Sequence, residues 1–142
     1  MNRELARKWS DAAKSGRYTQ GLGCLSQQRP EGEVFCFSGV LADVLVNEGI
    51  GFRWKKLPCV ADSQLIDDEG FGSAYSLPDR VCLLMDMSED MIAHLQECND
   101  NGVEFDALAK ALDKLIDDPA LEEEAKGWKY RTFLDYVISL RT

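Results

Sequence analysis

The sequence lacks most features of membrane, secreted or nucleic-acid-binding proteins. No apolar run approaches the roughly 20 residues that a membrane-spanning helix needs, and the first residues, MNRELARKW, have no signal-peptide core. Lys and Arg total 16 against 25 Asp and Glu, a net charge of −9. Binding to phosphates requires a basic surface. We therefore expect a cytoplasmic protein that spans no membrane and binds no nucleic acid directly.

Histidine is rare and cysteine is dispersed. The chain has one histidine, His94, and five cysteines that are odd in number, widely spaced and mostly flanked by apolar residues. This pattern is typical of reduced, buried thiols in a cytosolic protein rather than of a disulfide framework. The cysteines are Cys24, Cys36, Cys59, Cys82 and Cys98.

The length and composition favour a single domain over residues 1–142. A chain of this length buries about two-thirds of the surface that it exposes when unfolded. A hydrophobic content of 45% and a charged content of 29% are ordinary for a soluble globular protein.

The segment Phe35–Leu45 should form the folding centre. Residues 34–37 read as a short buried strand, after which apolar residues recur at helical spacing. Ser38 is the expected N-cap of this helix, and Gly49 is well placed to end it. Residues 27–33, which contain proline and glycine, should be the turn of a hairpin that leads into the strand.

The rest of the chain is predicted to be mainly helical. Amphipathic or capped helical patterns cover 3–15, 78–85, 89–98, 104–117 and 128–140, with a short turn at 120–126. Residues 52–55 alternate like a strand, and 62–75 are expected to be a loop with little regular structure. The predicted fold is a mostly helical α+β domain with an antiparallel hairpin or three-stranded sheet near the N-terminal half. Residues 119–142 look like a C-terminal helical addition.

Several motifs resemble those of an uncharacterised family of small phage and prophage proteins. That family opens with W-x-x-A-L-R-S-G-x-Y-x-Q-G-x-G-x-L, which residues 9–25 follow as WSDAAKSGRYTQGLGCL. A block similar to Y-C-C-L-G-V-L-C-D reads FCFSGVLAD over 35–43, and L-P-x-x-V reads LPDRV over 77–81. The motif L-N-D-x-G-x-x-F-x-x-I-A has its counterpart at 99–109, NDNGVEFDALA.

The resemblance implies a phage context and little chemistry, because the family has no established activity. Phe35, Phe37-Ser38 and Ala42 depart from its cysteine-containing block. These departures make a role that needs a cysteine pair doubtful.

No catalytic or metal-binding set is predicted. Cys36, at a strand-to-helix turn, could gain thiolate character from the helix N-terminus, but a buried inert thiol is favoured because no local signature accompanies it. His94 and Cys98 have a spacing that could bind zinc, yet such scattered residues usually pack in a core. The turn at 97–102 resembles half of a calcium loop but has Leu108 at the position of the final ligand. We expect no cofactor.

The negative charge is concentrated between residues 86 and 124, where two Lys or Arg face thirteen Asp or Glu. This block motivates the first functional hypothesis: a small, non-enzymatic phage protein that inhibits a host defence complex stoichiometrically. Its acidic face would mimic nucleic acid and bind a partner with a basic surface. The expected partner-binding residues are Glu97, Asp100, Glu104, Asp106, Asp113, Asp117, Glu122, Glu123 and Glu124.

Two other functional classes stay open. The first is a protein that sequesters a small nucleotide-like ligand near two closely spaced glycines, although a tight helix-to-strand connection is the favoured explanation of the glycines. The second is an uncharacterised enzyme. The aromatic residues of the last helix also predict a partner contact or homodimer. The residues for the alternative ligand site are Arg17, Tyr18, Gln20, Gly21 and Gly23.

Overall fold

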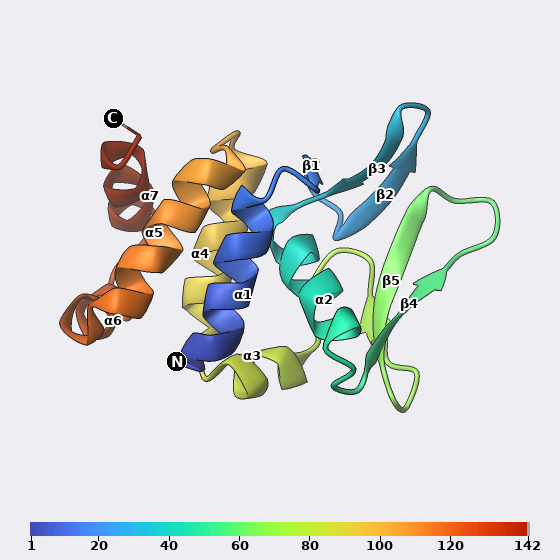
Figure 1. Cartoon of the computed structure of the whole chain (residues 1–142), viewed down its shortest axis with the longest axis horizontal. Helices are drawn as coiled ribbons and strands as arrows, with labels where there is room; N and C mark the ends of the chain where they lie inside the picture. The colour runs from blue at the N-terminus through green and yellow to red at the C-terminus, as the bar shows by residue number, and fades with distance from the viewer. Residues whose placement is uncertain (142) are drawn as a thin grey trace.

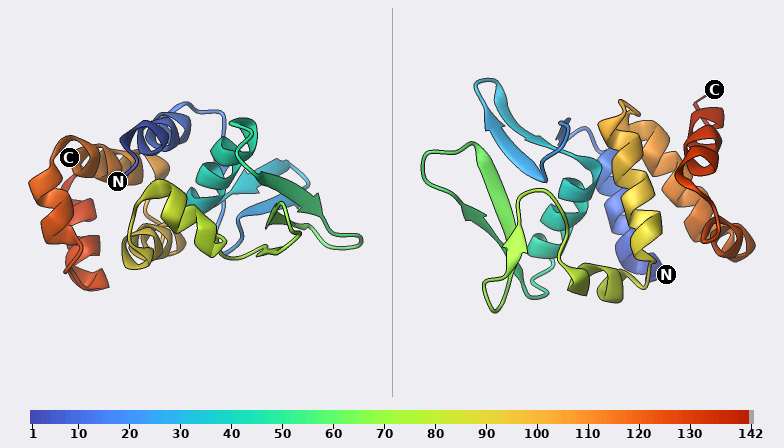
Figure 2. Two further views of the ribbon diagram at one scale, coloured as in Figure 1. Left: turned by 90° about the horizontal axis from the view of Figure 1, so that it is seen from below. Right: turned by 180° about the vertical axis from the view of Figure 1, so that it is seen from behind.

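A computed structural model describes residues 1–141 and shows a mostly helical α+β domain (Figure 1). The helical part occupies one side, the sheet lies on the other, and α2 lies between them (Figures 1 and 2). None of the described helices is long and apolar enough to cross a membrane. The helices are α1 (Arg3–Lys14), α2 (Phe37–Asn47), α3 (Asp79–Met85), α4 (Glu89–Asp100), α5 (Phe105–Asp117), α6 (Pro119–Ala125) and α7 (Tyr130–Ser139).

The sheet is larger than predicted and is mixed. It has six strands in the order β1-β3-β2-β5-β4, with β6 paired to β5. The pairing of β1 with β3 is parallel, and every other pairing is antiparallel. The predicted hairpin is confirmed as β2 and β3, but its bounds were wrong: residues 27–29 and 32–33, predicted as turn, pair within the strands, and Phe37, predicted as strand, begins α2. The strands are β1 (Thr19–Gln20), β2 (Ser26–Arg29), β3 (Gly32–Phe35), β4 (Phe52–Lys56), β5 (Asp62–Asp67) and β6 (Gly72–Ser73).

The predicted loop at 62–75 was wrong, because it contains β5 and β6. Ser63, Leu65 and Ile66 of β5 are buried, while the acidic residues Asp62 and Asp67 stand at its two ends. β5 pairs with three strands and joins the β2–β3 hairpin to β4. The acidic and glycine-rich composition hid a strand whose stability comes from its pairing with β2, β4 and β6.

The predicted N-cap of α2 was wrong by two residues. Cys36 is the N-cap, and its Sγ accepts a hydrogen bond from the Gly39 N–H at 3.3 Å. Ser38 instead lies buried in the first turn. By contrast, Ser88 caps α4 as expected by accepting from the Met91 N–H at 3.1 Å.

One continuous core joins the helices to the sheet. Trp9 of α1 is fully buried against Phe37 of α2, with ring centroids 4.6 Å apart, and its indole N–H donates to the Phe37 carbonyl oxygen at 2.9 Å. Leu65 of β5 and Phe133 of α7 belong to the same buried cluster. The strand-to-helix centre predicted around Phe35–Leu45 is therefore enclosed by helices and sheet.

Candidate functional site

In the predicted nucleotide-like ligand site, the polar groups of Gln20, Gly21 and Gly23 form hydrogen bonds with other residues of the protein. The Gln20 amide nitrogen donates to Asn99 Oδ1 at 2.8 Å and to the Val103 carbonyl at 2.7 Å, and its oxygen accepts from the Phe105 N–H. The Gly21 N–H donates to the Phe35 carbonyl at 2.7 Å. The Gly23 N–H donates to Asp100 Oδ1 at 3.0 Å. These groups tie β1 and its following loop to α4 and α5.

The two remaining residues of that site stand apart from its glycines. The Tyr18 hydroxyl donates to Asp43 at 2.5 Å, and burial first, with this hydrogen bond second, raises the pKa of Tyr18. Arg17 is exposed and stacks over the Tyr18 ring. Both face a shallow depression beside α1 and the end of α2.

Most of the predicted partner-binding carboxylates are neutralised within the protein. Asp113 pairs with Arg7 at 2.8 Å and with Lys14 at 2.6 Å, and Arg7 also contacts Asp117. Further pairs join Glu104 to Arg141 at 2.8 Å, Glu122 to Arg3 at 2.9 Å and Glu123 to Lys126 at 3.0 Å. The acidic block of the sequence therefore does not form one uncompensated surface.

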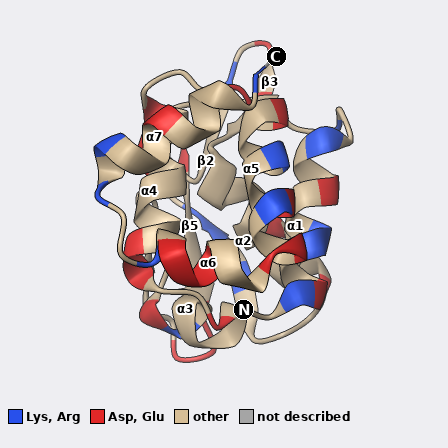
Figure 3. Cartoon of the chain, turned by 90° about the vertical axis from the view of Figure 1, so that its left-hand side faces the viewer, with Lys and Arg blue, Asp and Glu red and all other residues tan. Residues whose placement is uncertain are grey.

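Four of the predicted residues, Glu97, Asp100, Asp106 and Glu124, make no ion pair with any residue of the described chain. They lie on three different helices, α4, α5 and α6. Viewed toward α6 and α7, acidic residues gather around α6 and α3, whereas α1 carries the largest group of basic ones (Figure 3). Unpaired acidic residues thus occur on α4, α5 and α6, and acidic residues are also dense around α3.

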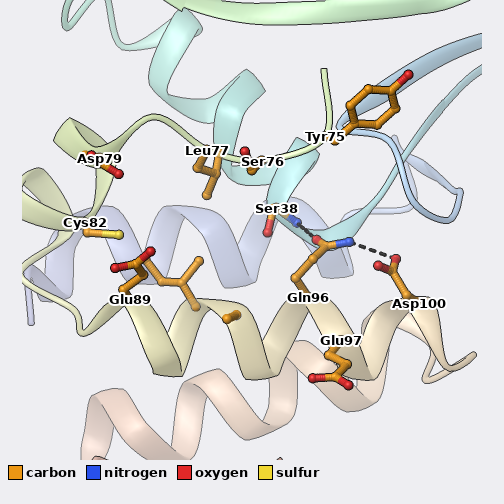
Figure 4. A pocket seen from close by; sticks show the side chains of 12 residues that line it. Ser38, Tyr75, Ser76, Leu77, Asp79, Cys82, Glu89, Gln96, Glu97 and Asp100 are labelled. Carbon is orange, nitrogen blue, oxygen red and sulfur yellow. Dashed lines mark hydrogen bonds between the residues drawn. The ribbon is translucent and has the colours of Figure 1, made fainter. Parts of the chain in front are cut away.

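A cleft on this side has a volume of about 270 Å³ and lies between α4, the N-terminal end of α3 and residues 75–77 (Figure 4). Leu77, Ile92 and Ala93 give it an apolar floor. Four carboxylates border it, and no Lys or Arg does: Asp79, Glu89, Glu97 and Asp100.

The carboxylates occupy the two ends of the cleft. Asp79 and Glu89 lie at one end, and Asp100 lies at the other, with Glu97 at the outer edge of α4 (Figure 4). Asp79, Glu89 and Glu97 are exposed and make no side-chain hydrogen bond or ion pair among residues 1–141. Asp100 accepts three hydrogen bonds through Oδ1, from the Gly23 N–H, Gln96 and Asn99, which leaves Oδ2 open.

The geometry of α4 explains this arrangement. Glu89, Ala93, Glu97 and Asp100 recur at intervals of three or four residues, so they share one face of the helix. The opposite stripe, with Met91, is buried in the core. Sequence periodicity could have identified this outward stripe, but no local signal predicts that Asp79 lies across from it.

The walls of the cleft are fixed by hydrogen bonds. Gln96 Oε1 accepts from the Ser38 N–H at 3.1 Å, and its amide nitrogen donates to Asp100 at 2.8 Å. Tyr75 is 63% exposed, and its hydroxyl donates to Asp62 at 3.1 Å. The cleft therefore combines a rigid polar wall, an exposed aromatic ring and unpaired carboxylates.

The thiols near these elements are poor nucleophiles. Burial, followed by the charges of Glu89 and Asp79, raises the pKa of Cys82, which also lines the cleft. Burial raises the pKa of Cys36 to about 12. This is opposite to the lowered pKa expected from its position at a helix N-terminus. Both thiols are protonated at neutral pH, so neither offers the thiolate that cysteine chemistry requires.

His94 lies one turn before Cys98 on α4 and packs against α7. Its Nε2 lies 3.1 Å from the Trp128 carbonyl oxygen, and its ring contacts Tyr130 and Phe133. Within residues 1–141, no group of three or more His, Cys, Asp or Glu side chains is arranged to hold a metal ion.

The aromatic residues of the C-terminal region mostly pack within the chain. Phe133 is fully buried, and Trp128 stacks against Tyr136 with centroids 5.4 Å apart. The exposed apolar side chain on this helix is Ile138, which is 42% exposed. The homodimer through this helix stays a prediction, and intramolecular packing now explains most of the aromatic content that motivated it.

Comparison with known proteins gives a family without an assigned function. No curated protein and no solved structure matches the chain. Residues 1–116 match a family described as a domain of unknown function, and α6 and α7 lie beyond the matched residues. Because the match covers most of the chain, this protein belongs to the DUF8296 family.

Proposed function

We propose that this protein is a non-enzymatic binding protein that engages a partner protein with a basic surface. The observation that carries the proposal is the acidic cleft, where Asp79, Glu89 and Glu97 have no cationic partner among the described residues. Other carboxylates, such as Asp113, are already paired. Unpaired like charges around one cleft repel one another, and an incoming cation relieves that repulsion.

The resemblance to small phage proteins supports a more specific form of the proposal. A phage protein that acts by stoichiometric binding would occupy a basic groove of a host defence complex and block it. The cleft then replaces the broader acidic face as the contact surface, and of the nine residues predicted for that face it keeps Glu97 and Asp100.

A charge-reversal experiment tests this function. The tagged protein is used to isolate a host partner, which is then purified and titrated against the triple variant Asp79→Lys, Glu89→Lys, Glu97→Lys. We expect a one-to-one complex that weakens steeply with salt and loses at least about a hundredfold in affinity in the variant, as expected for three charge-assisted contacts. Equal affinity of the variant would contradict the proposal.

A further inference from the structure

We infer that the acidic cleft recognises an extended segment of the partner protein in which two arginines flank an apolar residue, in the pattern Arg-x-apolar-x-Arg. This inference rests on the proposed function and specifies the partner's chemistry. It follows from three features of the cleft: two separated carboxylate ends, an apolar floor between them, and a limited volume.

The distance between the carboxylate ends sets the spacing of the two cations. Glu89 and Glu97 are eight residues apart on α4, which corresponds to about 12 Å along the helix axis. In an extended peptide, residues i and i+4 are about 13 Å apart and their side chains point to the same side. One cation can then reach Asp79 and Glu89 while the other reaches Glu97 and Asp100.

The apolar floor of the cleft determines which type of residue the partner segment carries between its two cations. Leu77, Ile92 and Ala93 line the same space, and Ile92 and Ala93 lie between Glu89 and Glu97 along α4. The i+2 side chain of an extended segment points to the same face as the two cations. An apolar side chain there would bury surface against this floor, whereas a polar one would lose hydration without gaining a partner.

Arginine fits the ends better than lysine. Its planar guanidinium binds carboxylates through two parallel hydrogen bonds and stacks on aromatic rings. Asp79 and Glu89 provide two carboxylates at one end, and the exposed ring of Tyr75 borders the cleft. Lysine would supply the positive charge but could not form two parallel hydrogen bonds with a carboxylate.

The volume of the cleft favours the binding of peptide side chains over the binding of a whole small molecule. At about 270 Å³, the cleft is smaller than the roughly 300–1,000 Å³ of typical small-molecule pockets. Its negative border also opposes phosphate-bearing ligands. A basic peptide segment that lies across the cleft needs only side-chain-sized space.

Peptide titrations followed by NMR provide the test. The probe is a capped Gly-Arg-Gly-Leu-Gly-Arg-Gly peptide, titrated into the full-length, isotope-labelled protein at low ionic strength. We expect the largest amide shifts at Leu77, Ile92 and Ala93. Replacing the central Leu of the probe by Ser, or both Arg by Lys, should each weaken binding about threefold or more.

Matched variants separate the cleft from net charge. Glu89→Gln and Glu97→Gln should each reduce the affinity for the probe about fivefold to tenfold, as expected for loss of a charge-assisted contact. Asp106→Asn removes the same charge from an exposed, unpaired carboxylate on α5, and it should change affinity less than twofold. Dispersed amide signals in each variant show that it is folded.

Three results would overturn the inference. A probe with adjacent arginines, Gly-Arg-Arg-Leu-Gly-Gly-Gly, that binds equally well would show a response to charge alone. Spermidine that binds the same residues more tightly would assign the cleft to a small polyamine. Absence of shifts at the floor would place the contact elsewhere. If the probe fails while charge reversal abolishes partner binding, the proposed function stands and only this inference falls.

Discussion

At the residue scale, the side chains that carry the motif resemblance support one another in the interior. Asp43 accepts hydrogen bonds from the Tyr18 hydroxyl and from the Trp54 indole N–H at 2.9 Å. Asn99 accepts from Gln20 and from the Phe37 N–H at 3.1 Å, and it donates to the Gly21 carbonyl at 3.0 Å. The motifs therefore describe a structural network that joins sheet and helices, and the cleft forms beside it.

Asn99→Ala should destabilise the protein by about 3 kcal/mol, because it leaves the buried Phe37 N–H and Gly21 carbonyl without this hydrogen-bond partner and removes one hydrogen bond from Gln20. The side chain of Asn99 is fully buried. The free energy of unfolding is measured by urea denaturation. Asn101→Ala is the matched control: this exposed residue donates to Tyr130 at 2.7 Å, and its loss should cost less than about 1 kcal/mol. Similar losses in both variants would contradict a structural role specific to Asn99.

Gly39→Ala should prevent folding or cost more than about 3 kcal/mol through overpacking. A Cβ at Gly39 would lie 1.7 Å from the Leu25 carbonyl oxygen, and both positions belong to backbone that cannot easily move apart. The readout is the yield of folded protein and its thermal midpoint. Gly127→Ala is the control, since its Cβ would meet only the Glu124 carbonyl at 3.6 Å. A normal midpoint for Gly39→Ala would show that α2 does not approach Leu25, the residue before β2, so closely.

At the element scale, paired charges join α1 to α5. Asp113 of α5 lies between Arg7 and Lys14 of α1 and also accepts a hydrogen bond from Ser10 at 2.6 Å. Burial alone would raise the pKa of Asp113, but the hydrogen bonds from Lys14 and Ser10 and the nearby positive charges outweigh it, so the pKa is lowered. The carboxylate form is therefore favoured by folding.

This lowered pKa predicts a pH-dependent effect of Asp113→Asn. A carboxyl whose pKa is lower in the folded state stabilises the protein above its unfolded pKa of about 3.9 and loses that contribution as pH falls. We expect the variant to be about 1–2 kcal/mol less stable at neutral pH, with the difference shrinking toward zero below about pH 3. Urea denaturation over this range measures the difference.

Asp135→Asn is the control for this pH dependence. Asp135 is exposed and lies 3.5 Å from Arg131 one turn away on α7. Surface pairs of this kind contribute about 0–1 kcal/mol, so the control should show a small loss that changes little with pH. A loss for Asp113→Asn that stays constant down to pH 3 would mean that packing, rather than charge, causes it.

At the scale of the whole molecule, α6 and α7 extend the core beyond the residues that match the family. Phe133 and Val137 of α7 are fully buried in the common cluster. Arg3 of α1 contacts the buried Glu122 of α6 at 2.9 Å and donates to the Ile116 carbonyl at 3.0 Å. The last two helices therefore pack into the same buried core as the rest of the protein.

Hydrogen exchange tests whether α7 unfolds together with α5. We expect the amides of α7 to reach the same opening free energy as those of α5 when exchange is measured in increasing urea, because a shared core opens together. The exposed terminus should exchange earlier through fraying. If the whole of α7 exchanged at low urea while α5 stayed protected, α6 and α7 would be a separately unfolding addition.

Local patterns predicted most helices and one hairpin. Ser88 and the apolar stripe of α5 are signals that act over a few residues, so α4 and α5 appeared close to their predicted bounds. β5 was missed because Asp62, Ser63, Gln64 and Asp67 give it a mostly polar composition, while its pairing with β2, β4 and β6 depends on other parts of the chain. Such pairing leaves little trace in composition.

The sequence by itself determined the mixed α+β class, the helical second half and the excess of negative charge, since these depend on composition and local periodicity. Only the tertiary structure decided which charges remain available. Asp113 and Glu122 meet cations from α1, whereas Asp79 and Glu89 meet none and border a common cleft. Charge is a property of each residue, but neutralisation depends on neighbours that folding brings together from distant parts of the chain.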